Sequence, residues 1–254
     1  MKVKSSNRLL EGGNLFVCHK LYGEKYCIIG ENSIQLEMNL KNTSRDKVLA
    51  RYSKILGVLP NRIIGVPNLT FHIDVQMCYA APGLFLIHSM QELLKNFPET
   101  CGEIIPENLV MEYDAQVDVI SNILLKNGFI CEKICGHIYM NEKSLCHAEI
   151  FNLKKIKSTI INIASDGKRR HFVLANTHVE EHKEYLNNKI KEICTRHNLP
   201  PISLHYLNIN EAEFNQALAL SGGYATSYAR ATQFFMRTNN GGLRCQTNFL
   251  LSNA

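Results

Sequence analysis

The sequence predicts an α/β protein built from repeated strand–strand–helix–strand units. Two observations support this class. First, short apolar runs and an amphipathic segment follow one another in the same order three times along the 254 residues. Second, strands that alternate with helices are typical of sheets covered by helices. A composition of 45% hydrophobic and 20% charged residues fits a globular chain of this kind.

The first unit occupies the N-terminal quarter of the chain. Gly23 provides the turn between its first two strands. Apolar residues that recur at helical spacing between 48 and 56 then indicate a helix, which Pro60 ends. The predicted elements are strands at 14–18 and 26–29, a helix with Thr43 or Ser44 as its N-cap, and a strand at 62–66.

The last unit repeats this order with a clearer turn signal. Asp166-Gly167 between two apolar runs is typical of a tight β-hairpin. The helix after it carries its apolar residues on one face and stops before Pro200-Pro201. The predicted elements are strands at 159–163 and 170–174, a helix at 180–197 and a strand at 202–207.

A third, looser copy lies between these two units. Its predicted elements are a strand within 69–79, a strand at 83–87, a helix within 112–126 and a strand at 129–134. No linker rich in Pro, Gly or Ser separates the copies, so we treat residues 1–254 as a single domain.

Charge and hydropathy argue against two classes of partner. The 28 Lys and Arg against 23 Asp and Glu give a net charge of only +5, so no nucleic-acid partner is expected. No apolar stretch reaches the about 20 residues of a membrane-spanning helix, so no membrane partner is expected. Nine cysteines without a framework spacing indicate free thiols in a reducing, cytoplasmic compartment. These patterns do not predict an oligomeric state.

His72 and Asp74 lie two residues apart in a run expected to be a strand. Side chains at i and i+2 of a strand share a face, so the imidazole and the carboxylate are expected side by side. A carboxylate beside an imidazole favours the protonated ring, which can act as a general acid. The alternative is a half-buried strand whose polar residues face solvent, because a two-residue motif is weak by itself.

Two glycine turns carry further candidates. Cys245 follows the tight-turn signal at 239–242, where a backbone turn can present a thiol as a nucleophile. Its alternative is a small buried thiol. Glu11 precedes Gly12-Gly13, and such glycines let the backbone bend or be approached closely. The alternative there is an ordinary surface turn.

In combination and in this order, these segments resemble the guanidino-group modifying enzymes. This pentein superfamily includes arginine, agmatine and protein-arginine deiminases. The resemblance spans residues 10–252, although the middle of that range holds no sharp motif. It implies an α/β propeller of five strand–strand–helix–strand units. The motifs that carry it are Glu11-Gly12-Gly13-Asn14, His72-x-Asp74, Gly241-Gly242-x-x-Cys245 and the following Gln246-Thr247-Asn248.

The resemblance implies a hydrolase, a deiminase that needs no metal or organic cofactor. Cys245 would be the nucleophile that forms a thiouronium-like adduct, and His72 would be the acid and base. Glu11 would support the histidine or the substrate. Asp74 would bind the planar guanidinium through paired hydrogen bonds, and Asn14 and Gly242 would complete the substrate-binding set. The substrate would be a guanidino small molecule or the arginine side chain of a protein.

One departure from the family concerns a second carboxylate. Family members generally supply another guanidinium-binding Asp upstream of the Glu-Gly-Gly segment, and none of the ten residues before Glu11 is acidic. Three units are visible rather than five. Either the chain is a fragment whose first units are missing or replaced, or Asp46 or Asp114 fills the role, or the substrate has changed. An inactive relative that acts as a binding protein and an amidinotransferase are the alternative functions.

Two other cysteine-based sites compete with this interpretation. A papain-like protease places its cysteine before its histidine, and the order here is the reverse. A zinc site is disfavoured because the spacing of its candidate ligands is irregular and lacks Cys-x2-Cys pairs. We therefore expect no metal. The candidate ligands for zinc are Cys131, Cys135, His137, Cys146 and His147.

Overall fold

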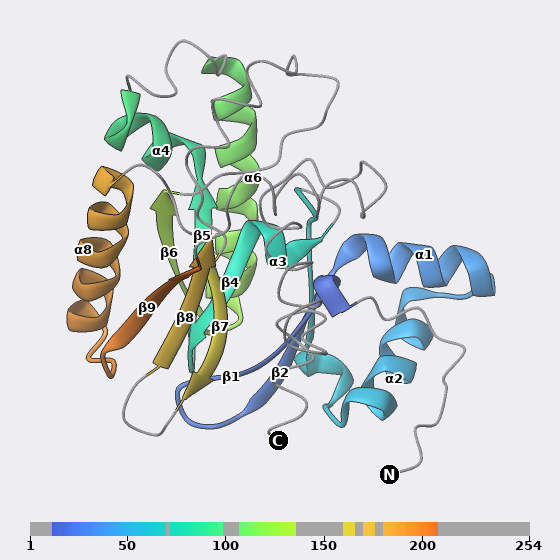
Figure 1. Cartoon of the computed structure of the whole chain (residues 1–254). Helices are drawn as coiled ribbons and strands as arrows, with labels where there is room; N and C mark the ends of the chain where they lie inside the picture. Colours follow the sequence, from blue (N-terminus) through green and yellow to red (C-terminus); the bar gives the residue numbers. More distant parts are fainter. Residues whose placement is uncertain are drawn as a thin grey trace.

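The computed structural model contains the expected unit three times (Figure 1). It describes residues 12–69, 72–98, 107–135, 160–165, 170–175 and 180–207. Each unit forms a three-stranded sheet whose second strand lies in the middle. The first strand pairs with the middle strand antiparallel, and the third pairs with it in parallel. The α/β class and the order of elements are confirmed, whereas closure into a propeller stays a prediction.

The first unit contains two helices where the sequence predicted one. Its elements are η1 (Gly12–Asn14), β1 (Leu15–His19), β2 (Lys25–Gly30), α1 (Glu31–Lys41), α2 (Arg45–Leu56), η2 (Pro60–Arg62) and β3 (Ile63–Val66). The turn at Gly23 has φ 87°, a conformation that favours glycine. The buried face of α1 combines Ile34 with the polar Ser33 and Glu37, so the helix lacks the apolar stripe that would have predicted it.

The second unit has the same strand order as the first, with a register shift between Tyr79 and Ala81 in its antiparallel pair. Its elements are α3 (Ile73–Gln76), β4 (Met77–Ala81), β5 (Leu84–Ser89), α4 (Met90–Asn96), α6 (Glu107–Lys126) and β6 (Ile130–Cys135). The prediction of a strand within 69–79 is wrong in its first part. The strand starts only at Met77, because residues 73–76 form α3.

The third unit follows the predicted ranges closely. Its elements are β7 (Ile160–Ser165), β8 (Arg170–Ala175), α8 (Glu180–Arg196) and β9 (Ile202–Leu207). Ser165 pairs with Arg170 in the antiparallel ladder, and the predicted turn residues Asp166-Gly167 lie outside the described residues. Polar contacts join α8 to the second unit. The Tyr185 hydroxyl accepts a hydrogen bond from the Cys135 amide at 3.1 Å and donates one to Glu92 Oε2 at 3.3 Å.

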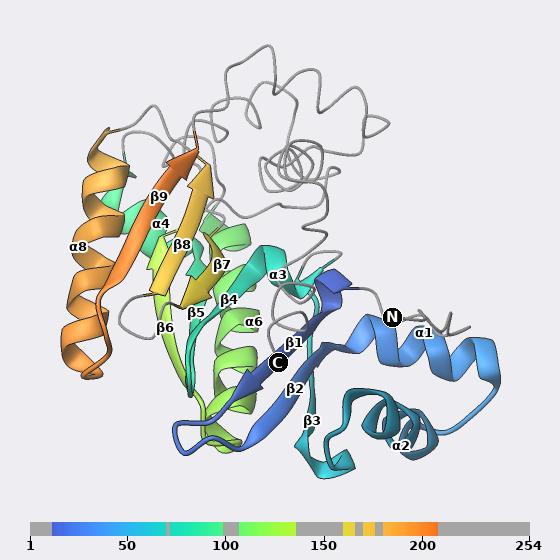
Figure 2. The same cartoon turned by 60° about the horizontal axis from the view of Figure 1, so that its bottom comes forward.

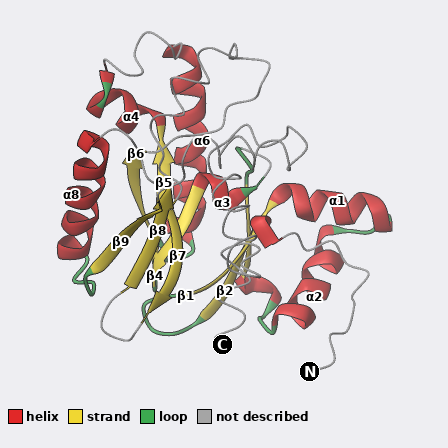
Figure 3. Cartoon of the chain, viewed as in Figure 1, coloured by secondary structure: helices red, strands yellow, loops and turns green. Residues whose placement is uncertain are grey.

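Sheets and helices alternate through the molecule (Figure 2). The helices α1 and α2 pack on one face of the first sheet, where Val17 and Ile29 meet Ile34 and Tyr52. The opposite face shares the largest apolar cluster with α6 and the second sheet. The far face of the second sheet packs against α8. Most strands therefore lie inside, with α1, α2, α4 and α8 at the periphery (Figure 3).

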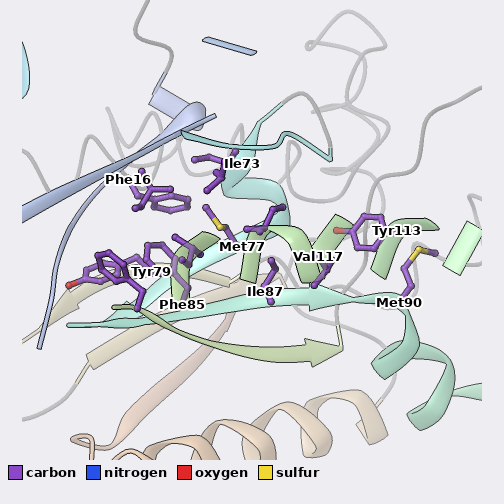
Figure 4. Packing of buried hydrophobic residues seen from close by; sticks show 14 of the residues in the cluster. Phe16, Ile73, Met77, Tyr79, Phe85, Ile87, Met90, Tyr113 and Val117 are labelled. Carbon is purple, nitrogen blue, oxygen red and sulfur yellow. The ribbon is translucent and has the colours of Figure 1, made fainter. Parts of the chain in front are cut away.

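The largest cluster fixes the first two units to each other (Figure 4). Phe85 of β5 is fully buried and meets Phe16 of β1 edge-on, with ring centroids 5.7 Å apart. The Tyr79 hydroxyl on β4 accepts a hydrogen bond from the His19 amide at 3.0 Å and donates one to the His19 carbonyl at 3.2 Å. The strand β4, which directly follows α3, is therefore tied to β1 of the first sheet.

Candidate functional site

Some of the predicted site residues are described by the structure, and others are not. His72, Asp74 and Asn14 lie within the described ranges. Glu11, Gly242 and Cys245 lie outside them, so their distances to His72 stay predictions.

His72 and Asp74 meet at the start of α3. The backbone of His72 is extended, with φ −133° and ψ 142°, and Asp74 lies in the first turn of the helix that follows. His72 Nδ1 is 4.0 Å from Asp74 Oδ1, within ion-pair range if the ring is protonated. The two groups are neighbours as expected, but they meet at a helix start and not through the alternation of a strand.

The carboxylate and the imidazole differ in burial. The Asp74 side chain is 1% exposed, and that of His72 is 15% exposed. Charge–charge interactions are stronger at a buried carboxylate than in water, because the surroundings screen them less. The pair therefore combines a partly exposed imidazole, that of His72, with a buried carboxylate, that of Asp74, which favours a positive charge nearby.

Gly13 lies directly against the ring of His72. A Cβ atom added at Gly13 would sit 2.3 Å from His72 Nδ1 and 2.6 Å from its Cγ. No side chain fits at that distance without a shift of the ring, so only glycine allows this approach. Of the bend and the close approach that the sequence predicts for Gly12-Gly13, the close approach is present at Gly13.

Asn14 joins the glycine segment to α3 through its side-chain oxygen. Asn14 is 3% exposed, and its Oδ1 accepts hydrogen bonds from the Ile73 amide at 3.1 Å and from Asn68 Nδ2 at 2.7 Å. Asn68 is a site residue that sequence reasoning missed. It stands alone in the segment after β3, where no motif or periodicity marks it.

Gln76 holds the same segment from the other side. It is fully buried at the end of α3, and its Oε1 accepts a hydrogen bond from the Leu69 amide at 2.7 Å. Its Nε2 donates to the Pro67 carbonyl at 3.0 Å. The segment before His72 is therefore tied to the helix that begins after it. Gln76 was also missed, because a single glutamine carries no sequence signal.

The two carboxylates considered as a second cation-binding group lie in helices elsewhere. Asp114 of α6 is 1% exposed, and its Oδ2 accepts hydrogen bonds from the Gln91 amide at 2.6 Å and from Ser89 Oγ at 3.3 Å. These contacts hold the start of α4. Asp46 is exposed in the first turn of α2. The second carboxylate of the family stays unassigned.

Burial makes the described cysteines poor nucleophiles. Cys18, Cys27, Cys78, Cys135 and Cys194 are buried, and Cys131 is partly buried. Burial raises the pKa of Cys27 to about 12 and that of Cys131 to about 12 as well. Since the thiolate is the reactive form, thiols in these surroundings are inert near neutral pH.

The described ranges hold neither a metal-binding group nor a membrane-spanning helix. Within them, no group of three or more His, Cys, Asp or Glu side chains is arranged to hold a metal ion. His137, Cys146 and His147 of the zinc alternative lie outside those ranges, so that alternative is not tested. No helix described here is both long enough and apolar enough to cross a membrane.

Comparisons with known proteins give structural similarity only. No model of a protein family matches the sequence, and no curated protein matches it. One similar structure is a cysteine-to-serine variant of the C. jejuni agmatine deiminase with substrate bound, with a TM-score of 0.44 at 11% identity over 79% of this chain and 52% of that one. The agmatine deiminase of C. jejuni gives a TM-score of 0.43 at 12% identity over 79% of this chain and 51% of that one. The chain thus spans about half the length of either structure.

Proposed function

We propose that the chain is a cysteine-dependent hydrolase of a guanidino group, of the deiminase type. The observation that supports the proposal is the meeting of two motifs that are far apart in sequence. Asn14 and Gly13 of the Glu-Gly-Gly-Asn segment contact the His72–Asp74 segment, and the hydrogen bond from Ile73 to Asn14 spans 59 residues. A shared site requires such a meeting, whereas two unrelated surface turns do not.

The residue types at this point suit chemistry on a planar cation. The buried carboxylate of Asp74 orients the guanidinium through N–H···O bonds. The thiolate of Cys245 attacks the guanidinium carbon, and His72 donates a proton to the departing ammonia. This step leaves a thiouronium adduct on sulfur. His72 then deprotonates a water molecule, which attacks the same carbon, and the C–S bond breaks to release a ureido product and the thiolate.

The remaining predicted residues have supporting roles in the proposal. Glu11 supports His72 or the substrate end of the site. Gly242 lies beside the thiol in sequence, and Asn14 completes the proposed substrate-binding set. The substrate is a guanidino small molecule or an arginine side chain of a protein. No step uses a metal ion or an organic cofactor.

The test measures ammonia and ureido product from agmatine, arginine and an arginine-containing peptide. Wild type is compared with Cys245→Ala, His72→Gln and Asp74→Asn. The control is Cys131→Ala, which removes a cysteine whose pKa is raised to about 12 by burial. Product that is lost in the three site variants and kept in the control supports the proposal.

Two outcomes favour the alternative functions. Binding of a guanidino compound without turnover indicates an inactive relative that acts as a binding protein. A product that forms only when an amine acceptor is added indicates an amidinotransferase, in which the amine takes the place of water in the second step.

A further inference from the structure

A chain of hydrogen-bonded amides leads from the start of α1 to the start of α3 through Asn68, which is partly buried, and Asn14, which is buried. Asn68 Oδ1 accepts a hydrogen bond from the Asn32 amide at 3.1 Å, in the first turn of α1. Asn68 Nδ2 donates to Asn14 Oδ1 at 2.7 Å. Asn14 Oδ1 in turn accepts from the Ile73 amide at 3.1 Å. Both ends of the Asn68 amide are therefore engaged, which fixes its orientation.

The oxygen of Asn14 also accepts a hydrogen bond from the first backbone amide of α3, that of Ile73. The first backbone N–H groups of a helix have no partner within the helix, and a side chain at the N-cap often supplies one. His72 occupies the N-cap position of α3 and makes no such side-chain bond. Asn14, at the end of η1, supplies the acceptor for the Ile73 amide. Because α3 has only four residues, its own hydrogen bonds contribute little to fixing its position.

Gly30 is needed for the close packing of this amide pair. A Cβ atom at Gly30 would lie 2.6 Å from Asn68 Oδ1 and 2.8 Å from Asn14 Oδ1. The backbone of Gly30, with φ −63° and ψ 130°, is open to any residue. The neighbouring asparagine side chains, and not the backbone conformation, therefore require glycine here.

We propose that Asn68 and Asn14 form a positioning pair that sets the geometry of His72 and Asp74. Asn68 fixes the oxygen of Asn14, and that oxygen fixes the Ile73 amide between the two site residues. The Asn14 oxygen thus acts on the protein, in addition to the substrate-binding role proposed for Asn14 above. The effect on turnover rests on the function proposed above, whereas the effect on the position of His72 does not.

The test uses variants that change hydrogen bonding at nearly constant shape. Asn68→Asp keeps the acceptor for Asn32 but places a second oxygen against Asn14 Oδ1. Asn14→Leu removes the acceptor, and Asn14→Asp keeps it. The control is Asn127→Asp, because Asn127 lies just after α6 and its side chain donates to the Ile123 carbonyl of that helix at 2.8 Å. Far-UV circular dichroism shows which variants fold, and Asn68→Ala replaces Asn68→Asp if the latter does not.

Two readouts separate the positioning role from the proposed function. The first is the NMR spectrum of the His72 ring with the exchange rate of the Ile73 amide. The second is kcat/KM on whichever guanidino substrate is turned over. We expect Asn68→Asp and Asn14→Leu to shift the His72 signals, speed exchange at Ile73 and lower kcat/KM about 100-fold, the loss typical of a misplacement by about 1 Å. Asn14→Asp should retain about tenfold more activity than Asn14→Leu.

The outcomes are distinguishable. If wild type turns over no guanidino substrate while the His72 signals and Ile73 exchange respond as expected, the proposed function fails and the positioning pair stands. If Asn68→Asp, or Asn68→Ala in its place, leaves the His72 signals and Ile73 exchange as they are in Asn127→Asp, the positioning pair is refuted.

Discussion

Replacement of Gly13 by alanine is a direct test of the contact at the centre of the candidate site. The added Cβ would lie 2.3 Å from His72 Nδ1, 2.6 Å from Cγ and 2.9 Å from Cε1. Non-bonded atoms of this kind relax to about 3.5 Å, so the ring must move by about 1 Å. The φ angle of Gly13 lies outside the left-handed range, so the alanine backbone is not strained.

The expected loss of activity follows from that displacement. A misplacement of a reacting group by about 1 Å can lower the rate about 100-fold, because the reacting atoms leave their aligned positions. We therefore expect Gly13→Ala to lower kcat/KM for the guanidino substrate about 100-fold. The free energy of unfolding should change little, since the added methyl group meets side-chain atoms of His72 and not the backbone, and 15% of that side chain is exposed.

Gly57→Ala provides a control with the opposite effects. Gly57 follows α2 with φ 64°, and a Cβ there would meet no atom within 4 Å. Alanine in a left-handed conformation costs about 1 kcal/mol, so this variant should lose stability and keep its activity. The free energy of unfolding in urea and the steady-state kcat/KM are measured for both variants and compared with wild type. A Gly13→Ala protein with wild-type kcat/KM would show that the position of His72 is irrelevant to the reaction.

Three further results are expected. Burial would raise the pKa of Glu132, but hydrogen bonds from His197 and Arg196 outweigh it, and the pKa lies below its usual value. The stability that results is present above the ordinary glutamate pKa and is lost as the pH falls. Urea unfolding should therefore show that Glu132→Gln lowers the free energy of unfolding at pH 7, and lowers it much less below pH about 4. Tyr79→Phe leaves the His19 amide without its partner and should cost about 1–3 kcal/mol by the same method. Iodoacetamide near pH 8 should label a fast-reacting thiol that is absent from Cys245→Ala, because a raised pKa keeps buried thiols protonated, and equal labelling of the variant would contradict this.

The parts of the fold that the sequence predicted are those with a strong local pattern. The strand at 26–29 is an apolar run, the strand at 202–207 alternates apolar and polar residues, and the helix that became α8 carries an apolar face. The missed helices lack such a pattern. α1 buries two polar residues beside Ile34, and α4 has only seven residues. Their helical state depends on packing against sheets formed elsewhere in the chain.

The candidate site shows a similar division. His72 and Asp74 were found because their residue types and spacing are chemically suggestive. The helix that brings them together was missed, because its first amide is satisfied by Asn14, 59 residues away. The mixed run at 69–79 is compatible with a strand until that hydrogen bond and the Gln76 contacts are known. Asn68 had no signal at all, since its role depends only on what lies around it.

Four glycines of this chain show why sequence alone does not reveal the reason for which a position requires glycine. Gly23 and Gly57 have φ of 87° and 64°, so the backbone itself requires glycine there. Gly13 and Gly30 require it for another reason, because the ring of His72 and the amide of Asn68 occupy the space of a side chain. A sequence shows the same letter in both cases. A glycine whose φ is open to any residue can still be required because a neighbouring polar side chain occupies the space of a Cβ atom. Substitution of that glycine then tests whether the position of the neighbouring side chain matters.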